Sequence, residues 1–185
     1  MALSERELLD QARGGDLDAF AEFVRAFERR VRALLYRLLD DARDVDEAVQ
    51  DTFVQAWRNL ERFRGDAAPY TWLYRIAVNE ALMRRRRKTL PTTELQETTV
   101  AGGEDAFAAA DVRGFLIERL RRLPDEYRIA VVLRDVEGLS NEEVAAALEI
   151  SLAAAKSRIH RGRMQLREAL EGWESGGRDQ PSEQR

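Results

Sequence analysis

Cysteine is absent from this 185-residue chain, and histidine occurs once, as His160. Without thiolates the chain has no disulfide, no cysteine-liganded zinc site and no cysteine nucleophile, and a single imidazole does not build a histidine metal cluster. We also find no metal-carboxylate cluster and no serine nucleophile with a convincing partner, so we expect no metal, no cofactor and no catalytic residue, and the protein is not predicted to be an enzyme. The lack of cysteine also fits a reducing cytoplasm.

Long apolar runs are missing as well. No stretch approaches the roughly 20 apolar residues that cross a bilayer. The first ten residues already carry Glu and Arg and lack the apolar core of a signal peptide. We expect a soluble, cytoplasmic protein without membrane insertion.

Sustained period-two alternation is also missing, whereas apolar residues recur at three- and four-residue spacings almost throughout, so we predict an all-α fold. Capping-box pairs Ser4/Glu7 and Asp44/Glu47 start two of the predicted helices. The other helices are expected over residues 16–39, 70–88, 112–122 and 125–136.

The net charge of −4 is unevenly distributed. Residues 1–88 hold 17 basic and 16 acidic side chains, residues 89–112 hold none and 5, and residues 113–172 hold 11 and 10. This pattern predicts two small helical domains, 1–88 and 112–172, joined by a flexible acidic linker, 89–111. Residues 173–185, rich in Gly, Ser and charge, are predicted to be a disordered tail.

A helix-turn-helix is predicted near residues 140–170. Ser140 and Glu143 form a capping box for a short alanine-rich helix, and Ser151 caps a second helix a few residues later. At 100° per residue, Ala155, Ile159, Gly162 and Leu166 fall at roughly 0°, 40°, 340° and 20° and form one buried stripe. The opposite, donor-bearing side suits base reading in the major groove and consists of Lys156, Ser157, His160 and Arg161.

The N-terminal half offers two further candidate surfaces. Aromatic residues precede a block of five cations on one helix, a combination that holds unstacked bases, although Trp72 and Tyr74 could equally be core residues. An acidic cluster on the preceding helix is either a solvated face or a protein-docking surface; it contains Asp46, Glu47, Gln50 and Asp51.

Four phrases together resemble the extracytoplasmic-function group of bacterial sigma factors. They are DVDEAVQDTFVQAWRNLERFRGD (44–66), YTWLYRIAVNEA (70–81), RLPDEYRIAVVLRDVEGLSNEEVAAAL (122–148) and AKSRIHRGRMQLRE (155–168), in the family's order. The resemblance implies a sigma2-like and a sigma4-like domain that direct core RNA polymerase to promoters and open the minus-ten region.

The resemblance also implies site residues and partners. Minus-ten contacts would come from the 63–71 loop with Trp72 and Asn79, and from Arg84, Arg85, Arg86, Arg87 and Lys88, while the reading face of the second domain would meet the minus-thirty-five element. The polymerase clamp would dock on Asp46, Glu47, Gln50, Asp51 and Phe53, and the flap is the second core contact. The family commonly pairs with anti-sigma factors, but no residue here identifies one.

Two departures and two alternatives remain. Glu149 stands where the family often has Gly, and the alanines at 153–155 supply few donors, so the promoter sequence is left open. Ala155 should also thin the local core by about 1 kcal/mol. The alternatives are an autonomous helix-turn-helix regulator that binds a palindrome, and a recombinase or nuclease, for which we find no catalytic constellation.

Overall fold

The computed structural model describes residues 3–89 and 107–176, with side chains for 3–88 and 114–171. Within these ranges the chain is helical and contains no strand, which confirms the all-α prediction. None of the described helices is long and apolar enough to cross a membrane. The predicted linker and tail lie largely outside the described residues, at 90–106 and 177–185.

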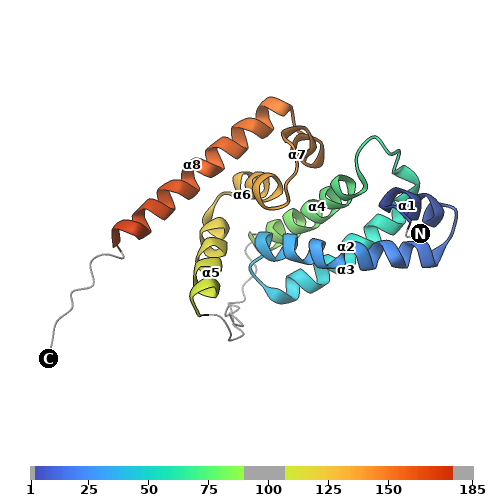
Figure 1. Cartoon of the computed structure of the whole chain (residues 1–185), viewed down its shortest axis with the longest axis horizontal. Coiled ribbons are helices and arrows are strands. Elements are labelled where there is room, and N and C mark those ends of the chain that lie inside the picture. Colours follow the sequence, from blue (N-terminus) through green and yellow to red (C-terminus); the bar gives the residue numbers. More distant parts are fainter. Residues whose placement is uncertain (1–2, 90–106, 177–185) are drawn as a thin grey trace.

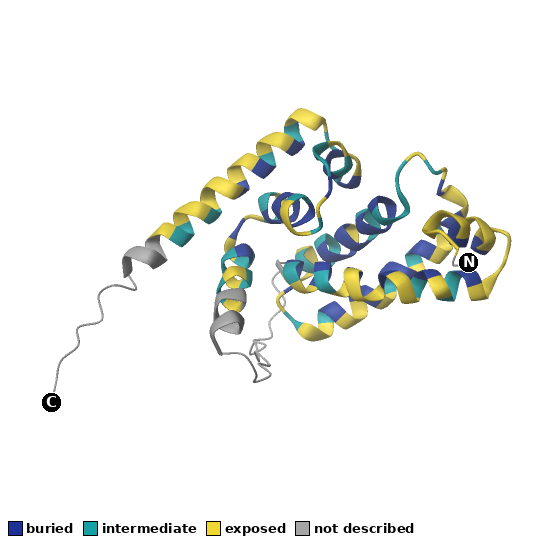
Figure 2. Ribbon diagram, in the orientation of Figure 1, coloured by how far each residue is buried: buried dark blue, intermediate teal, exposed yellow. Residues whose placement is uncertain are grey.

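The N-terminal domain is a bundle of α1 (Glu5–Arg13), α2 (Leu17–Leu38), α3 (Ala42–Arg58) and α4 (Pro69–Thr89), with a 3-10 turn, η1 (Leu60–Arg62), before α4. The long α2 buries its three- and four-residue stripe, with Phe23, Val31 and Leu34 fully covered, because that face meets α1, α3 and α4. Figure 2 shows buried residues alternating with exposed residues along the helices of this domain.

Two predicted helix starts in this domain can be compared with the structure. The Ser4/Glu7 capping box is present: the Ser4 hydroxyl accepts from the Glu7 amide, and the Glu7 carboxylate accepts from the Ser4 amide at 2.7 Å. The predicted start at Asp44 is wrong, because Asp41 caps α3 by accepting from the Arg43 amide at 2.8 Å. Both aspartates suit a helix start, and the earlier one adds a turn.

The C-terminal domain contains α5 (Phe107–Arg122), α6 (Asp125–Val131), α7 (Asn141–Leu148) and α8 (Leu152–Gly176). Helix α5 starts five residues before the predicted domain boundary at 112, since the alanine run at 108–110 favours a helix. Helix α8 reaches three residues beyond Trp173, where the tail was predicted to begin.

Helix α6 continues into a π-helical turn, η2 (Val132–Val136), where the sequence predicted regular helix. The Glu137 amide donates to the Val132 carbonyl at 3.0 Å, which closes the wider turn. Gly138, with φ of +77°, then redirects the chain toward α7.

The two domains touch along one seam. Helix α7 packs on α4, and α5 and α6 contact α2, while α8 extends away from the N-terminal bundle, as Figure 1 shows. Helix α4 is therefore partly covered by the C-terminal domain, whereas α8 is not covered by the N-terminal bundle.

Candidate nucleic-acid interface

Helices α7 and α8 form the predicted helix-turn-helix. Ser140 Oγ accepts from the Glu143 amide at 3.1 Å, the Glu143 carboxylate accepts from the Ser140 amide at 2.8 Å, and Ser151 Oγ accepts from the Ala154 amide at 3.1 Å. These bonds satisfy helix-start amides that have no partner within the helix. Both predicted caps are confirmed.

The reading face of α8 is open to solvent. Lys156, Ser157, His160 and Arg161 are exposed, whereas Ala155 and Ile159 are buried against α6 and α7. The helical-wheel prediction of which side faces the core is confirmed. Four donors therefore point outward from a firmly packed helix, the arrangement that major-groove reading needs.

Ion pairs fasten the flanks of α8 and leave its reading face free. Arg158 Nε lies 3.3 Å from Glu126 Oε2, and Arg163 Nη2 lies 2.5 Å from Asp135 Oδ1. On the reading face, Arg161 only shares a 3.4 Å hydrogen bond with the Tyr127 hydroxyl, which raises its pKa. The sequence alone did not separate these structural cations from the candidate DNA ligands.

Helix α8 approaches α6 closely at Gly162. A Cβ placed there would lie 2.5 Å from Val131 Cγ2 and 3.1 Å from the Tyr127 carbonyl oxygen. Only a residue without a side chain lets the two helices cross at this distance. Gly162 therefore sets the position of the reading face on the domain.

Glu149 ends α7 in the left-handed region, with φ 53° and ψ 43°. Among the described residues it is the only non-glycine residue with positive φ. Glycine is favoured in this conformation because a Cβ crowds the neighbouring carbonyl. The departure from glycine noted in the sequence therefore carries backbone strain.

A pocket of about 330 Å³ opens where the 62–67 loop meets the start of α4. Trp72 and Thr71 line it, Trp72 packs on Phe63 with ring centroids 5.2 Å apart, and Ala146 of α7 forms part of its wall. The Thr71 hydroxyl is buried and has no hydrogen-bond partner among the described residues. An aromatic ring and an unused donor are what a flipped base requires.

Trp72 and Tyr74 are both buried, so the reading of these aromatics as core residues holds for each. Tyr74 donates to Glu137 Oε2 at 2.8 Å, and burial raises its pKa. Asn79 is exposed and lies two turns beyond Trp72, beside a second hollow of about 240 Å³ that it shares with residues of α6, α7 and α8. The structure therefore does not bring Asn79 into the loop pocket.

The five cations that end α4 divide into two groups. Arg84 pairs with Glu47 at 3.0 Å and with Asp51; Arg85 pairs with Asp40 at 2.8 Å, and Lys88 with Asp44 at 2.5 Å. The Asp44 carboxylate raises the pKa of Lys88. Arg86 and Arg87 are exposed and form no ion pair in the part of the chain that the structure describes, so they are the two cations most available to phosphate.

The predicted docking residues on α3 do not share one environment. Asp46, Glu47 and Gln50 are exposed, Asp51 is half-buried, and Phe53 lies in the core, where its side chain cannot face a partner. Val54 and Trp57 are exposed instead, 45% and 38%. They continue the stripe of Glu47 and Gln50 at helical spacing, and the docking residues implied by the family resemblance did not include them.

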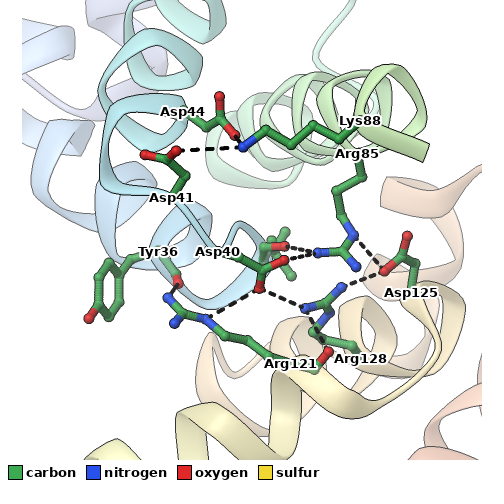
Figure 3. Close-up of polar contacts among 10 residues, drawn as sticks. Tyr36, Asp40, Asp41, Asp44, Arg85, Lys88, Arg121, Asp125 and Arg128 are labelled. Carbon is green, nitrogen blue, oxygen red and sulfur yellow. Dashed lines mark hydrogen bonds and ion pairs between the residues drawn. The ribbon is translucent and has the colours of Figure 1, made fainter. Parts of the chain in front are cut away.

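The seam between the domains is rich in reciprocal ion pairs (Figure 3). Asp40 of the N-terminal domain pairs with Arg121 at 3.6 Å, and Asp125 of the C-terminal domain pairs with Arg85 at 2.8 Å. Arg128 joins both acids; burial lowers its pKa most, and the neighbouring Arg85 adds to the effect. In the described residues, no cluster of His, Asp and Glu could hold a metal ion.

Two helical domains, one with a free basic reading helix and the other with an aromatic pocket beside arginines, define a DNA-binding protein. The Sigma-70 region 2 model matches residues 23–90, and the Sigma-70 region 4 model matches residues 116–166. The chain is 34% identical over 176 residues to the ECF RNA polymerase sigma-E factor of Escherichia coli, covering 87% of this chain and 91% of that protein. It is 32% identical to the RNA polymerase sigma-H factor of Pseudomonas aeruginosa, covering 90% and 94%.

Solved structures agree with these sequence matches. CnrH in complex with the cytosolic domain of CnrY superposes with a TM-score of 0.71 at 29% identity, over 91% of this chain and 97% of that one. The sigma factor RpoE bound to the anti-sigma factor NepR, from Bartonella quintana, gives 0.70 at 26% identity, over 84% and 98%. The chain belongs to the ECF group of the sigma-70 family and is an RNA polymerase sigma factor.

Proposed function

We propose that three surfaces divide the work of promoter recognition. The exposed stripe of α3 docks on the polymerase clamp, the loop pocket and α4 take the melted minus-ten strand, and the reading face of α8 meets the minus-thirty-five element. The two domains follow the same division: the first two surfaces lie on the N-terminal domain, which ends with α4, and the third lies on the C-terminal domain, which begins with α5. The protein acts without catalysing a covalent reaction, because all three surfaces only bind, and it works in the cytoplasm, where core polymerase and promoter DNA are found.

The loop pocket is the observation that carries this proposal. It places the Trp72 ring, the free Thr71 hydroxyl and the guanidinium-bearing residues Arg62 and Arg75 around one hollow of about 330 Å³. Flipping a base out of the duplex costs a few kcal/mol. Stacking on an aromatic ring and a hydrogen bond to the base edge offset that cost, so a melted strand is held and a closed duplex is not.

An anti-sigma partner is part of the proposal. The structures of CnrH and of the Bartonella quintana sigma factor both contain a bound partner, named for the latter as the anti-sigma factor NepR. We propose that a protein of this kind also binds the present chain and competes with core polymerase.

Run-off transcription tests the central proposal. Purified core polymerase is mixed with genomic fragments, with and without the full chain, and specific transcripts are expected only with it. If the chain bound a palindromic duplex tightly on its own and failed to bind core, the autonomous-regulator alternative would hold instead.

Replacing cations of the reading face should weaken promoter binding. We expect Lys156→Ala and Arg161→Ala each to reduce holoenzyme affinity for a promoter duplex by about 1–3 kcal/mol, as lost base contacts do. Arg158→Ala is the matched control, because Arg158 is paired with Glu126 and lies at about 300° on the same helical wheel, outside the reading face. Promoter affinity is measured by fluorescence anisotropy. If all three variants lost the same affinity, the effect would come from the overall positive charge of the helix and not from base contacts made by the reading face.

Replacing the acids of α3 should weaken core binding. We expect Asp51→Ala to lower affinity for core polymerase by about fivefold, in the range of a rim charge, and to leave DNA binding by the free chain unchanged. Arg84→Ala should act in the same way, because Arg84 holds Glu47 and Asp51, whereas Arg87→Ala should weaken DNA contacts. Glu22→Ala is the neutral control, because Glu22 is an exposed acid of α2 that forms no ion pair with any described residue. If Arg84→Ala instead lowered affinity for DNA and left affinity for core polymerase unchanged, Arg84 would belong to the residues that contact the minus-ten strand.

A further inference from the structure

Helix α1 lies against the loop that forms the pocket. Its buried face, Leu8, Leu9 and Ala12, packs into the N-terminal bundle, and the helix also contacts η1 and α4. The 62–67 loop joins η1 to α4 and lines the pocket. Helix α1 is therefore a neighbour of the site proposed for the minus-ten strand, and neither the sequence motifs nor the family resemblance placed a site residue in it.

The loop has few hydrogen bonds of its own. The Phe63 amide donates to the Leu60 carbonyl at 3.1 Å, and the Trp72 amide donates to the Ala68 carbonyl at 3.1 Å. Between these two bonds, residues 64–67 form no backbone–backbone hydrogen bond with any described residue. Gly65 also passes through the left-handed region, with φ of +76°. A segment with so few internal bonds takes its shape from what packs against it.

Arg13, in the last turn of α1, holds the start of this loop. Its Nη1 donates to the Phe63 carbonyl oxygen at 3.2 Å, across 50 positions of the chain. The Phe63 ring is buried and packs on the Trp72 ring, with centroids 5.2 Å apart. A hydrogen bond from a guanidinium is stronger than one between neutral groups. Contacts thus run without a break from α1 through Phe63 to the ring on which the flipped base is proposed to stack.

Arg6, two helical turns before Arg13, holds the middle of the loop. Two residues at this spacing lie on one face of a helix, so α1 presents both guanidinium groups to the loop. The Arg6 guanidinium lies against Gly65, because a Cβ added to Gly65 would be 3.0 Å from Arg6 Cζ. Glycine is therefore required at 65 for two reasons, the positive φ and the space that Arg6 occupies.

We propose that α1 belongs to the minus-ten site: Arg6 and Arg13 are positioning residues that hold the 62–67 loop in the shape that selects the captured base. They act through Gly65 and Phe63 and not by touching the base. A hydrogen bond to a base edge discriminates between bases only when donor and base are held in a fixed geometry. This inference rests on the proposed minus-ten role of the loop pocket.

A promoter library with a randomised minus-ten element tests base selection. The library is built on a promoter recovered by run-off transcription, each template carries a transcribed barcode, and the transcripts made by holoenzyme are sequenced. We expect Arg13→Ala to lower the preference for the favoured base about three- to tenfold at one or two adjacent positions, in the range of one lost hydrogen bond. Preferences at the other positions and affinity for core polymerase should not change. Arg13→Lys, which can still donate to the Phe63 carbonyl, should restore most of the preference.

Asp10→Asn is the matched control for Arg13→Ala. It removes the ion pair between Arg13 and Asp10 and leaves the donor to Phe63 in place, so the base preferences should stay as they are. If Asp10→Asn changed the preferences as much as Arg13→Ala, the ion pair and not the loop contact would be responsible. If Arg13→Ala lowered the yield from all templates equally, α1 would only support the fold. Either result would overturn the inference.

Gly65→Ala tests the second contact. The added methyl group displaces the Arg6 guanidinium and strains the backbone, so the base preference should fall at the same positions. Arg6→Ala should cause a smaller loss. The double variant should lose less than the sum of the two, because both changes remove one shared contact. Strictly additive losses would show that Arg6 does not hold the loop.

Thr71→Val distinguishes this inference from the proposed function. It keeps the shape of the side chain and removes the hydroxyl from the pocket, so it should change the preference at the same positions as Arg13→Ala. If Thr71→Val changes the preference and Arg13→Ala does not, the pocket reads the base without help from α1, and only this inference fails. If neither variant changes any preference, the loop pocket is not the minus-ten site, and the proposed function fails at that surface as well.

Discussion

Replacing Gly162 by valine should unfold much of the C-terminal domain. The new Cβ would lie 2.5 Å from Val131 Cγ2 and 3.1 Å from a backbone oxygen, and the backbone atom has no free rotamer to move into. Overpacking of this kind, with a β-branched side chain, costs about 3 kcal/mol, a large share of the stability of a small domain. Hydrogen exchange followed by mass spectrometry should show α6 and α8 losing protection together.

Two substitutions calibrate this result. Gly114 lies in α5 with no atom within 4 Å of an added Cβ, so Gly114→Ala should raise stability by up to about 1 kcal/mol through helix propensity alone. Gly162→Ala should fall between the two, since it adds only the clashing carbon. Normal protection of α6 and α8 in Gly162→Val would mean that the helices cross elsewhere or at a greater distance.

Replacing Trp72 by alanine should abolish promoter opening. The ring is 6% exposed and packs on Phe63 beside the loop pocket, so its loss costs the N-terminal domain about 3–5 kcal/mol. It also removes the stacking surface proposed for the flipped base, worth about 1–3 kcal/mol. Permanganate reactivity of thymines in the minus-ten region, measured with holoenzyme, should fall by about 10- to 100-fold.

A milder variant and a pre-opened template separate folding from melting. Trp72→Phe keeps an aromatic ring and the fold and should lose only part of the opening rate. On a template with a mismatched bubble at the minus-ten position, the phenylalanine variant should transcribe as well as the unmodified protein, because the step it impairs has been bypassed. If the phenylalanine variant still transcribed poorly on the bubble template, Trp72 would not act in capturing the melted strand.

The elements that the sequence predicted well are those governed by local rules. The capping box at Ser140 and the buried stripe through Ala155 and Ile159 depend only on residues within a few turns, and both are present. The prediction of where α3 starts was wrong because Asp41 and Asp44 are both suitable N-cap residues, and local propensity alone does not distinguish them. The π turn at η2 has no signature in the periodicity used to predict α6.

Roles that depend on long-range partners were beyond the sequence. A row of cations from Arg84 to Lys88 looks uniform until the structure pairs Arg84 with α3 and Arg85 with Asp40 and Asp125. In the same way, Phe53 and Trp57 are both apolar and lie four residues apart on α3, and only the structure shows that Phe53 is buried whereas Trp57 is 38% exposed. The contact between α7 and α4 joins residues far apart in the sequence, such as Tyr70 and Glu143, which are 73 positions apart, and no local signal predicts it.

The paired cations of α4 have a consequence for how tightly this protein holds nucleic acid at different ionic strengths. Binding to a polyanion is driven largely by the mobile ions that each new phosphate contact sets free. Arg84, Arg85 and Lys88 are already neutralised by carboxylates of the same chain, so they displace no condensed ions when a strand arrives. If α4 contacts the melted strand as proposed, only Arg86 and Arg87 release ions in that way. We therefore expect α4 to hold DNA more loosely, and with less sensitivity to salt, than its five consecutive positive charges suggest.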